Sequence, residues 1–269
     1  MYRRLLIPVS EAAEVEPLIR FGAQLLDAEG QIRILHVIPY TSLPEITRAW
    51  RESVHIVVPA HETAAALDVP VEPEVRVAPD VAGEIIESAT SHSIDGILMT
   101  LRGSPRSPNP FVGHTASTIL QHASPDVLLV NRLALATQSF TKILVPSFLG
   151  SGPSPKAMQL AEVLALKHDS APIVSLTISS EPLTHEETPP QDRTPRGLEL
   201  RHRHTLLPES LLGRRHRIPD LILSAAARER YGFLMVVEDR PNARGPLLTR
   251  RFVEDLFRSA PCPVMAVRG

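Results

Sequence analysis

The chain has 269 residues, a length typical of about two ordinary domains. Hydrophobic residues make up 43% and charged residues 22%, which excludes a disordered, collagenous or disulfide-rich protein. The net charge of −2 divides unevenly: residues 1–138 hold 16 acidic and 10 basic side chains, a net of −6, and residues 139–269 hold 14 and 18, a net of +4. Neither half has the basic density of a dedicated nucleic-acid binder, so no nucleic-acid partner is expected.

In chain order, the first half alternates short apolar runs with longer amphipathic stretches. The expected strands are 5–9, 32–38, 71–77, 96–100 and 127–130, and the expected helices are 16–28, 45–67, 81–91 and 115–121. A break in the second helix is expected at Pro59. Strands rich in Ile, Leu and Val that alternate with helices predict a parallel sheet with helices on both faces.

The second half repeats the first. Three blocks recur in order: 4–10 as 142–147, 96–99 as 232–235, and 123–130 as 260–267. The matching strands are expected at 142–146, 173–178, 198–204, 233–237 and 264–267, and 180–196 is expected to be a mobile surface loop. The sequence therefore predicts two tandem doubly wound α/β domains, each with a five-stranded parallel sheet, over residues 1–134 and 139–269.

The single cysteine and the lack of a recognisable targeting segment indicate the cytoplasm. Cys262 is alone, so an intramolecular disulfide is excluded, which fits a reducing cytoplasm. Because prolines flank it ahead of an apolar run, we expect an inert core thiol. The opening apolar run Leu5–Ile7 is too short for a signal peptide, and no stretch reaches the ~18–20 apolar residues of a membrane helix. We expect a soluble, cytoplasmic protein without membrane insertion.

Candidate binding residues lie where strands of the first half end. In an open α/β sheet, ligands bind outside the carboxyl ends of the strands, where the strand order reverses. Gly103 permits a close backbone approach, and nine residues separate it from Gly113, which opens a helix. The N–H groups of 113–115 and the helix dipole favour an anion, to which Arg102 and Arg106 add charge. The spacing predicts a phosphate-type site.

Four sequence features together resemble the universal stress protein family. They are the strand ending in Pro8-Val9, the Leu35-His36-Val37 strand, the spacing of Gly103 and Gly113, and the Ala260-Pro261-Cys262-Pro263 entry to the last strand. The resemblance covers nearly the whole chain as a tandem of two such domains. It implies the adenine nucleotide alpha hydrolase-like fold and a role in the stress response. Nucleotide-binding members carry an Asp two residues after the first-strand Pro, and a Gly-x-x-Gly, nine-residue, Gly-Ser or Gly-Thr motif that cradles ATP.

The resemblance implies an adenine-nucleotide pocket in the first domain. The positions are Pro8, Ser10, Val37, Met99, Thr100, Arg102, Gly103, Gly113, His114 and Thr115. Three of them depart from the pattern. Ser10 replaces the Asp, Thr100 replaces the first Gly, and His114 replaces the hydroxyl residue, although a protonated His can still donate. The sequence leaves two alternatives open: the pocket binds ATP or another adenine nucleotide, or it is empty or binds a different ligand.

The second domain is expected to bind no nucleotide. Glu238 and Asp239 stand where Gly103 stands in the first, and two acids repel a polyphosphate. We expect a degenerate copy retained for structure or pairing. The region Arg193–Arg217, rich in Arg and His, is either an anion or acidic-partner surface or a solvated edge. No metal is expected at His202 and His204, because no third ligand is evident.

The sequence therefore predicts a binding and regulatory protein that is not an enzyme. The resemblance implies that the two domains pair within one chain through their last strands, 127–130 with 264–267. One alternative is a slow ATPase or autophosphorylating protein, which the loss of the Asp at Ser10 disfavours. Another is an interaction protein, such as a transporter partner or a homodimer, with 104–110 and Arg193–Arg217 as contact surfaces.

Overall fold

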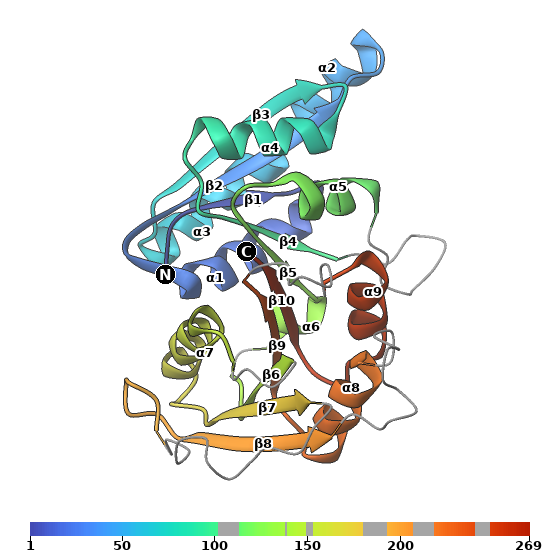
Figure 1. Cartoon of the computed structure of the whole chain (residues 1–269). Coiled ribbons are helices and arrows are strands. Elements are labelled where there is room, and N and C mark those ends of the chain that lie inside the picture. Colours follow the sequence, from blue (N-terminus) through green and yellow to red (C-terminus); the bar gives the residue numbers. More distant parts are fainter. Residues whose placement is uncertain (102–112, 138, 149–152, 180–192, 207–217, 240–247) are drawn as a thin grey trace. The chain divides into compact units, whose positions relative to one another are not determined.

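The structure is a computed structural model that describes residues 1–101, 113–137, 139–148, 153–179, 193–206, 218–239 and 248–269 (Figure 1). The contacts divide the chain into two compact units. The first comprises residues 1–102, 111–130 and 268–269, and the second comprises 103–110 and 131–267. Each unit is a parallel sheet with helices, which confirms the expected fold class.

The first unit is built on five parallel strands. They are β1 (Tyr2–Pro8), β2 (Leu26–Pro39), β3 (Val71–Ala78), β4 (Gly96–Thr100) and β5 (Asp126–Val130). Its helices are the 3-10 helix η1 (Ala12–Glu14) and α1 (Val15–Leu25), α2 (Leu43–Glu52), α3 (Val54–Leu67), α4 (Val81–Ser91) and α5 (His114–His122). The sheet order is β3-β2-β1-β4-β5, so the strand order reverses between β1 and β4.

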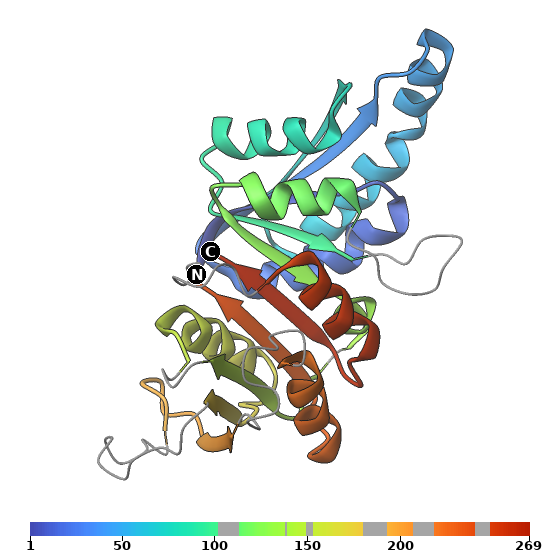
Figure 2. The ribbon, with the colours of Figure 1, turned by 45° about the vertical axis from the view of Figure 1, so that its right-hand side comes forward.

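Helices cover both faces of the first sheet. Helices α4 and α5 pack together on one face, and α1 and α3 pack together on the other (Figures 1 and 2). The central strand is apolar on both sides, because Leu5, Leu6 and Ile7 are all fully buried. Helix α1 buries Leu18, Ile19 and Leu25 on its apolar stripe, as its 3.6-residue periodicity predicts. The centre of the sheet is therefore dry on both faces.

Two predicted helix boundaries in this unit were wrong. The helix expected at 16–28 ends at Leu25, because Leu26 already pairs with Tyr2 as the first residue of β2. The helix expected at 45–67 is broken at Ser53 and not at Pro59, which lies inside α3. At this break, the hydroxyl of Ser53 donates to the Trp50 carbonyl at 2.6 Å.

The second unit repeats this topology. Its strands are β6 (Ile143–Phe148), β7 (Ile173–Ser179), β8 (Leu200–Leu206), β9 (Phe233–Glu238) and β10 (Val264–Arg268). Its helices are α6 (Arg132–Ala136), α7 (Pro155–Lys167), α8 (Ile218–Arg228) and α9 (Arg250–Ser259). The order β8-β7-β6-β9-β10 has the same third, second, first, fourth, fifth arrangement of strands as the first unit. Most of the loop expected at 180–196 lies outside the described residues.

Within the described part of the chain, none of the helices combines the length and the apolar character that crossing a membrane requires.

Candidate functional site at the carboxyl edge of the first sheet

Val9, the residue after β1, is hydrogen-bonded to β2 through its backbone N–H and its carbonyl. The Val9 N–H donates to the Leu35 carbonyl at 2.9 Å, so the parallel ladder continues one residue beyond β1. The His36 ring lies on the same junction, and its Nδ1 donates to the Val9 carbonyl at 3.0 Å. This fixed exit leads to Ser10, which is exposed at the edge of the sheet.

A carboxylate lies at the point where the strand order reverses. Thr100, the last residue of β4, donates its hydroxyl to Oε1 of Glu14 in η1 at 2.7 Å. The two residues are 86 positions apart, and they meet because β1 and β4 are neighbours. Glu14 therefore brings negative charge to the edge where the sequence predicts an anion. Sequence reasoning missed this residue, although an acid soon after the first strand was a readable signal.

Gly113 is the N-cap of α5, and no described side chain caps this helix. Its φ of −60° is accessible to any residue, and a Cβ on Gly113 would meet no described atom within 4 Å. Neither this backbone angle nor the described neighbours therefore require glycine here. The exposed His114 and half-buried Thr115 follow, and the N–H groups of this first turn can receive an anion.

Eight of the ten expected pocket positions lie in the described residues. They are Pro8, Ser10, Val37, Met99, Thr100, Gly113, His114 and Thr115, whereas Arg102 and Gly103 lie outside. The strand-borne positions share one edge, because β2, β1 and β4 are neighbouring parallel strands. Val37 is buried near the end of β2, whereas Met99 and Thr100 are half-buried at the end of β4.

The matching edge of the second unit is filled by its own side chains. Glu238, the last residue of β9, is 7% exposed and accepts the Leu248 N–H at 2.9 Å. Thr249 caps α9 by accepting the Phe252 N–H at 3.3 Å. The Glu238 carboxylate and the Thr249 hydroxyl thus accept hydrogen bonds from backbone N–H groups that an anion would otherwise use.

The described part of the region Arg193–Arg217 has its basic groups engaged. Arg201 donates to Glu199 at 2.6 Å, and Arg203 lies 3.7 Å from Glu229. The His204 ring bonds the Ser179 hydroxyl at 2.7 Å. Residues 207–217 lie outside the described part. Among the residues that the structure describes, no group of three His, Cys, Asp or Glu side chains is placed to hold a metal ion.

Together, the fold and this edge define a protein of two doubly wound α/β units in tandem. Residues 1–131 match the model of the universal stress protein family. A universal stress protein from Archaeoglobus fulgidus superposes with a TM-score of 0.65 at 15% identity, over 98% of this chain and 95% of that one. The cytoplasmic domain of a prokaryotic cation chloride cotransporter superposes with a TM-score of 0.56 at 13% identity, over 99% and 95%. No curated protein matches the chain.

Proposed function

We propose that the protein is a non-enzymatic regulatory binding protein of the stress response, with an altered adenine-nucleotide site in its first unit. The observation that carries the proposal is the difference between two equivalent helix starts. Helix α5 begins at Gly113 without a described side-chain cap, whereas α9 is capped by Thr249. Among the described residues, the first turn of α5 thus has no side-chain partner for its N–H groups, whereas the first turn of α9 has one, and this difference supports an anion site in the first unit.

The described residues fit the phosphate end of a nucleotide in the first unit. No described atom lies within 4 Å of a Cβ at Gly113, so the described residues leave room for a phosphate close to the helix backbone. The N–H groups and dipole of α5 supply favourable electrostatics. Ser10 and Thr100 are neutral, so neither repels a phosphate directly.

Glu14 is the feature that alters this site. Its carboxylate accepts the Thr100 hydroxyl at the edge that the phosphates would approach. Like charges at short range in a partly dry site repel each other, and this repulsion weakens the binding of a polyphosphate most. The site therefore favours nucleotides that carry little charge near Glu14.

The test is isothermal titration of the full chain with ATP, ADP, AMP and adenosine. We expect Glu14→Gln to raise the affinity for ATP about three- to tenfold, because it removes one repulsive charge. Adenosine affinity should not change. The matched control is Glu16→Gln, since Glu16 is exposed and paired with Arg20 one turn along.

A second variant tests the helix start. Gly113→Glu should abolish nucleotide binding, because it sets a carboxylate at the N–H groups of α5, and no described atom lies within 4 Å of a Cβ there. Thermal denaturation shows whether the variant stays folded. If neither the wild-type chain nor Glu14→Gln binds any of the four ligands at millimolar concentration, the nucleotide proposal is wrong. Phosphate release in the same mixtures would contradict the non-enzymatic part.

A second candidate function is that of a partner for a membrane transporter. The chain has the fold of a cotransporter's cytoplasmic domain over its whole length. A nucleotide-free protein that shows no thermal shift with any nucleotide would favour this candidate. A pull-down with the cytoplasmic loops of a cation transporter would then test it directly.

Within either function, we propose that the two units pair through their last strands, 127–130 and 264–267. Each of these strands is terminal in its own unit's strand order. Each is also a run of apolar residues, and an exposed apolar edge strand promotes aggregation unless another strand covers it.

A further inference from the structure

A cavity of about 230 Å³ opens at the amino edge of the first sheet, at the opposite ends of the strands from the candidate nucleotide site. Strands β1, β2 and β3 and the carboxyl end of α4 line it. At a share of about 30 Å³ for each water in the liquid, it has room for roughly seven waters or one small organic molecule. Its polar side chains are Arg4, Gln31, Arg33, Glu72, Ser91, His92 and Ser93.

The charges around this cavity favour an anion. Arg33 forms an ion pair with Glu72, so these two lining residues neutralise each other. Within the described residues, Arg4 belongs to no salt bridge. Its Nη1 donates to the His92 carbonyl at 3.2 Å, and the Asp95 carboxylate accepts its backbone N–H at 3.0 Å. The Arg4 guanidinium therefore keeps donors for a negatively charged ligand.

The same edge of the second unit has an equivalent backbone. Lys142 takes the place of Arg4, because each carbonyl accepts an N–H from the residue just before β9 or β4, at 3.0 and 2.9 Å. Arg230 takes the place of Ser93, because each has a positive φ, 49° and 50°, in the turn after α8 or α4. The two edges can therefore be compared residue by residue.

The second unit supplies an anion at this place from its own chain. Glu229, one position before the turn residue, stands where the first unit has His92. Its carboxylate lies 3.7 Å from Nζ of Lys142 and 3.7 Å from the Arg203 guanidinium, and it accepts the Tyr231 hydroxyl at 3.0 Å. The first unit has the cation and the cavity, but no described carboxylate in a salt bridge with that cation.

We propose that the cavity at the amino edge of the first unit binds a small carboxylate, which takes the place that Glu229 fills in the second. Arg4 supplies the charge, and the amide of Gln31, which is in register with Arg4, supplies a neutral donor. The exposed hydroxyls of Ser91 and Ser93 supply two more. Because the carboxyl end of α4 disfavours an anion, we expect millimolar affinity.

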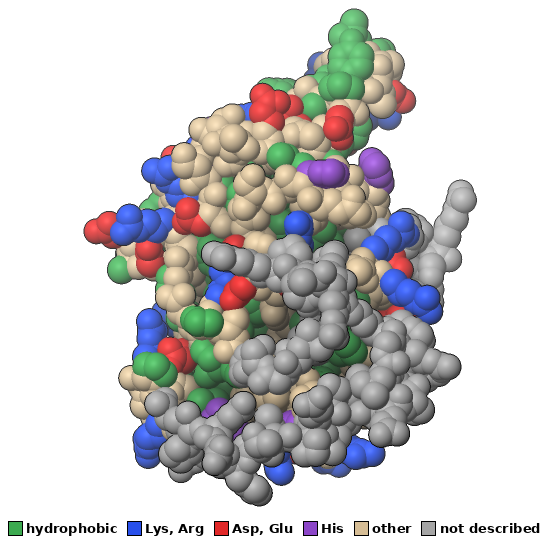
Figure 3. All heavy atoms as spheres, viewed as in Figure 1, with side chains coloured by type: hydrophobic (Ala, Val, Ile, Leu, Met, Phe, Trp, Pro, Cys, Tyr) green, Lys and Arg blue, Asp and Glu red, His purple; other side chains and the backbone are tan. Residues whose placement is uncertain are grey.

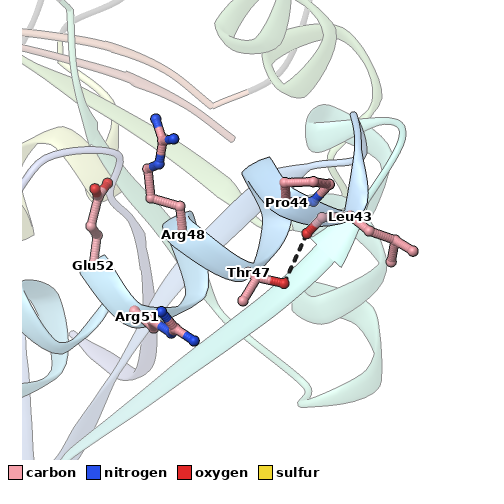
Figure 4. Close-up of a pocket in the computed structure, with 6 residues that line it drawn as sticks. All are labelled: Leu43, Pro44, Thr47, Arg48, Arg51 and Glu52. Carbon is pink, nitrogen blue, oxygen red and sulfur yellow. Dashed lines mark hydrogen bonds between the residues drawn. The ribbon is translucent and has the colours of Figure 1, made fainter.

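An arginine on helix α2 is a matched control for the charge of Arg4. Arg48 belongs to no salt bridge of the described residues. It lies on an open groove along this single helix, over which hydrophobic side chains gather (Figure 3). The groove is lined by Leu43, Pro44, Thr47, Arg48, Arg51 and Glu52 (Figure 4). Arg48 thus offers an unpaired guanidinium without the converging strands of the cavity.

Nuclear magnetic resonance of the isotope-labelled full chain, titrated with sodium succinate, measures the binding. We expect the amide signals of 31–33 and 91–94 to shift and to saturate at millimolar succinate. Succinamide, the neutral analogue, and sodium chloride at equal ionic strength should cause no such shift. Arg4→Gln should weaken succinate binding at least about tenfold, because a charge-assisted hydrogen bond is lost. Arg48→Gln should leave the binding unchanged.

His92→Glu tests the comparison between the units. It gives the first unit the carboxylate that Glu229 supplies in the second, so we expect succinate binding to be lost. His92→Gln is its control, because it too loses the contact of the His92 ring with the Ser88 carbonyl but adds no charge, and it should bind succinate as the wild type does. The spread of the amide signals shows that each variant is folded. Adenosine affinity should not change in any of them, because the nucleotide site lies at the other ends of the strands.

Three results would overturn the proposal. The first is a wild-type chain whose signals do not shift at tens of millimolar succinate, and the second is an equal response to succinamide. The third is an Arg4→Gln or a His92→Glu chain that binds succinate as tightly as the wild type. Failure of adenosine to bind would count against the nucleotide site alone.

Discussion

At the scale of single residues, burial decides the chemistry of the one thiol. Cys262 is 4% exposed at the entry to β10. Desolvation disfavours the thiolate and raises the pKa of Cys262 to about 11. Because the pKa is raised, the thiol stays protonated throughout the physiological range. The side chain is an apolar part of the core, and it lacks the electropositive, accessible setting that a reactive cysteine needs.

We expect slow alkylation of Cys262 in the native chain. At pH 8, roughly one thiol in a thousand is ionised when its pKa is about 11, and that fraction rises tenfold with each pH unit until the pKa is reached. Iodoacetamide labelling followed by mass spectrometry measures the rate from pH 7 to 10. The urea-unfolded chain, in which the thiol regains its ordinary pKa, is the control. Equal rates for native and unfolded chains would contradict this prediction.

At the scale of elements, equivalent strands of the two units begin with a glycine for different reasons. Gly96 begins β4, and a Cβ there would lie 2.9 Å from side-chain atoms of Leu5 and Tyr2. Gly232 directly precedes β9, and a Cβ there would lie 2.7 Å from the Thr141 backbone nitrogen. A side chain can rotate away, whereas Thr141 adjoins Lys142, whose carbonyl accepts the Gly232 N–H at 3.0 Å, so this backbone cannot shift without disturbing that hydrogen bond.

These two glycines give a matched pair of substitutions. We expect Gly232→Ala to lower the free energy of unfolding by about 2–3 kcal/mol, because the backbone at Thr141, just before β6, must move away. Gly96→Ala should cost about 1 kcal/mol, since Leu5 and Tyr2 can shift. Urea denaturation followed by circular dichroism measures both. The reverse order of the two effects would show that the side chains around Gly96 are the more rigid neighbours.

Element order could be predicted from the sequence, but contacts between distant residues could not. Apolar runs and the internal repeat locate the strands of both units, because strand burial leaves a local pattern. The break at Ser53 leaves no such pattern, and Pro59 is a stronger local signal. The bond between Thr100 and Glu14 joins residues 86 positions apart. The glycine pattern therefore indicated the candidate site, but the carboxylate within it appeared only in the fold.

At the scale of the whole molecule, the two repeated halves differ in net charge and in the groups that they offer to a ligand. The first half has a net charge of −6 and the second +4, so the two halves attract each other over distances up to about a Debye length. Among the described residues, the helix start at Gly113 in the acidic half has no side-chain cap, and the start at Thr249 in the basic half is capped by the Thr249 hydroxyl. The copies have thus diverged into a candidate ligand unit and a supporting unit.

Pairing of the units through their last strands can be tested by amide hydrogen exchange in the full chain. The strands β3 and β8 lie at the other ends of the two strand orders and serve as internal controls. In an edge strand only alternate N–H groups are bonded, so β3 and β8 should show alternate slow and fast exchange. If 127–130 and 264–267 cover each other, every amide of both strands has a partner, and we expect uniformly slow exchange there. Alternate fast exchange within 127–130, like that of β3, would show that the last strands are free edges and that the units do not pair there.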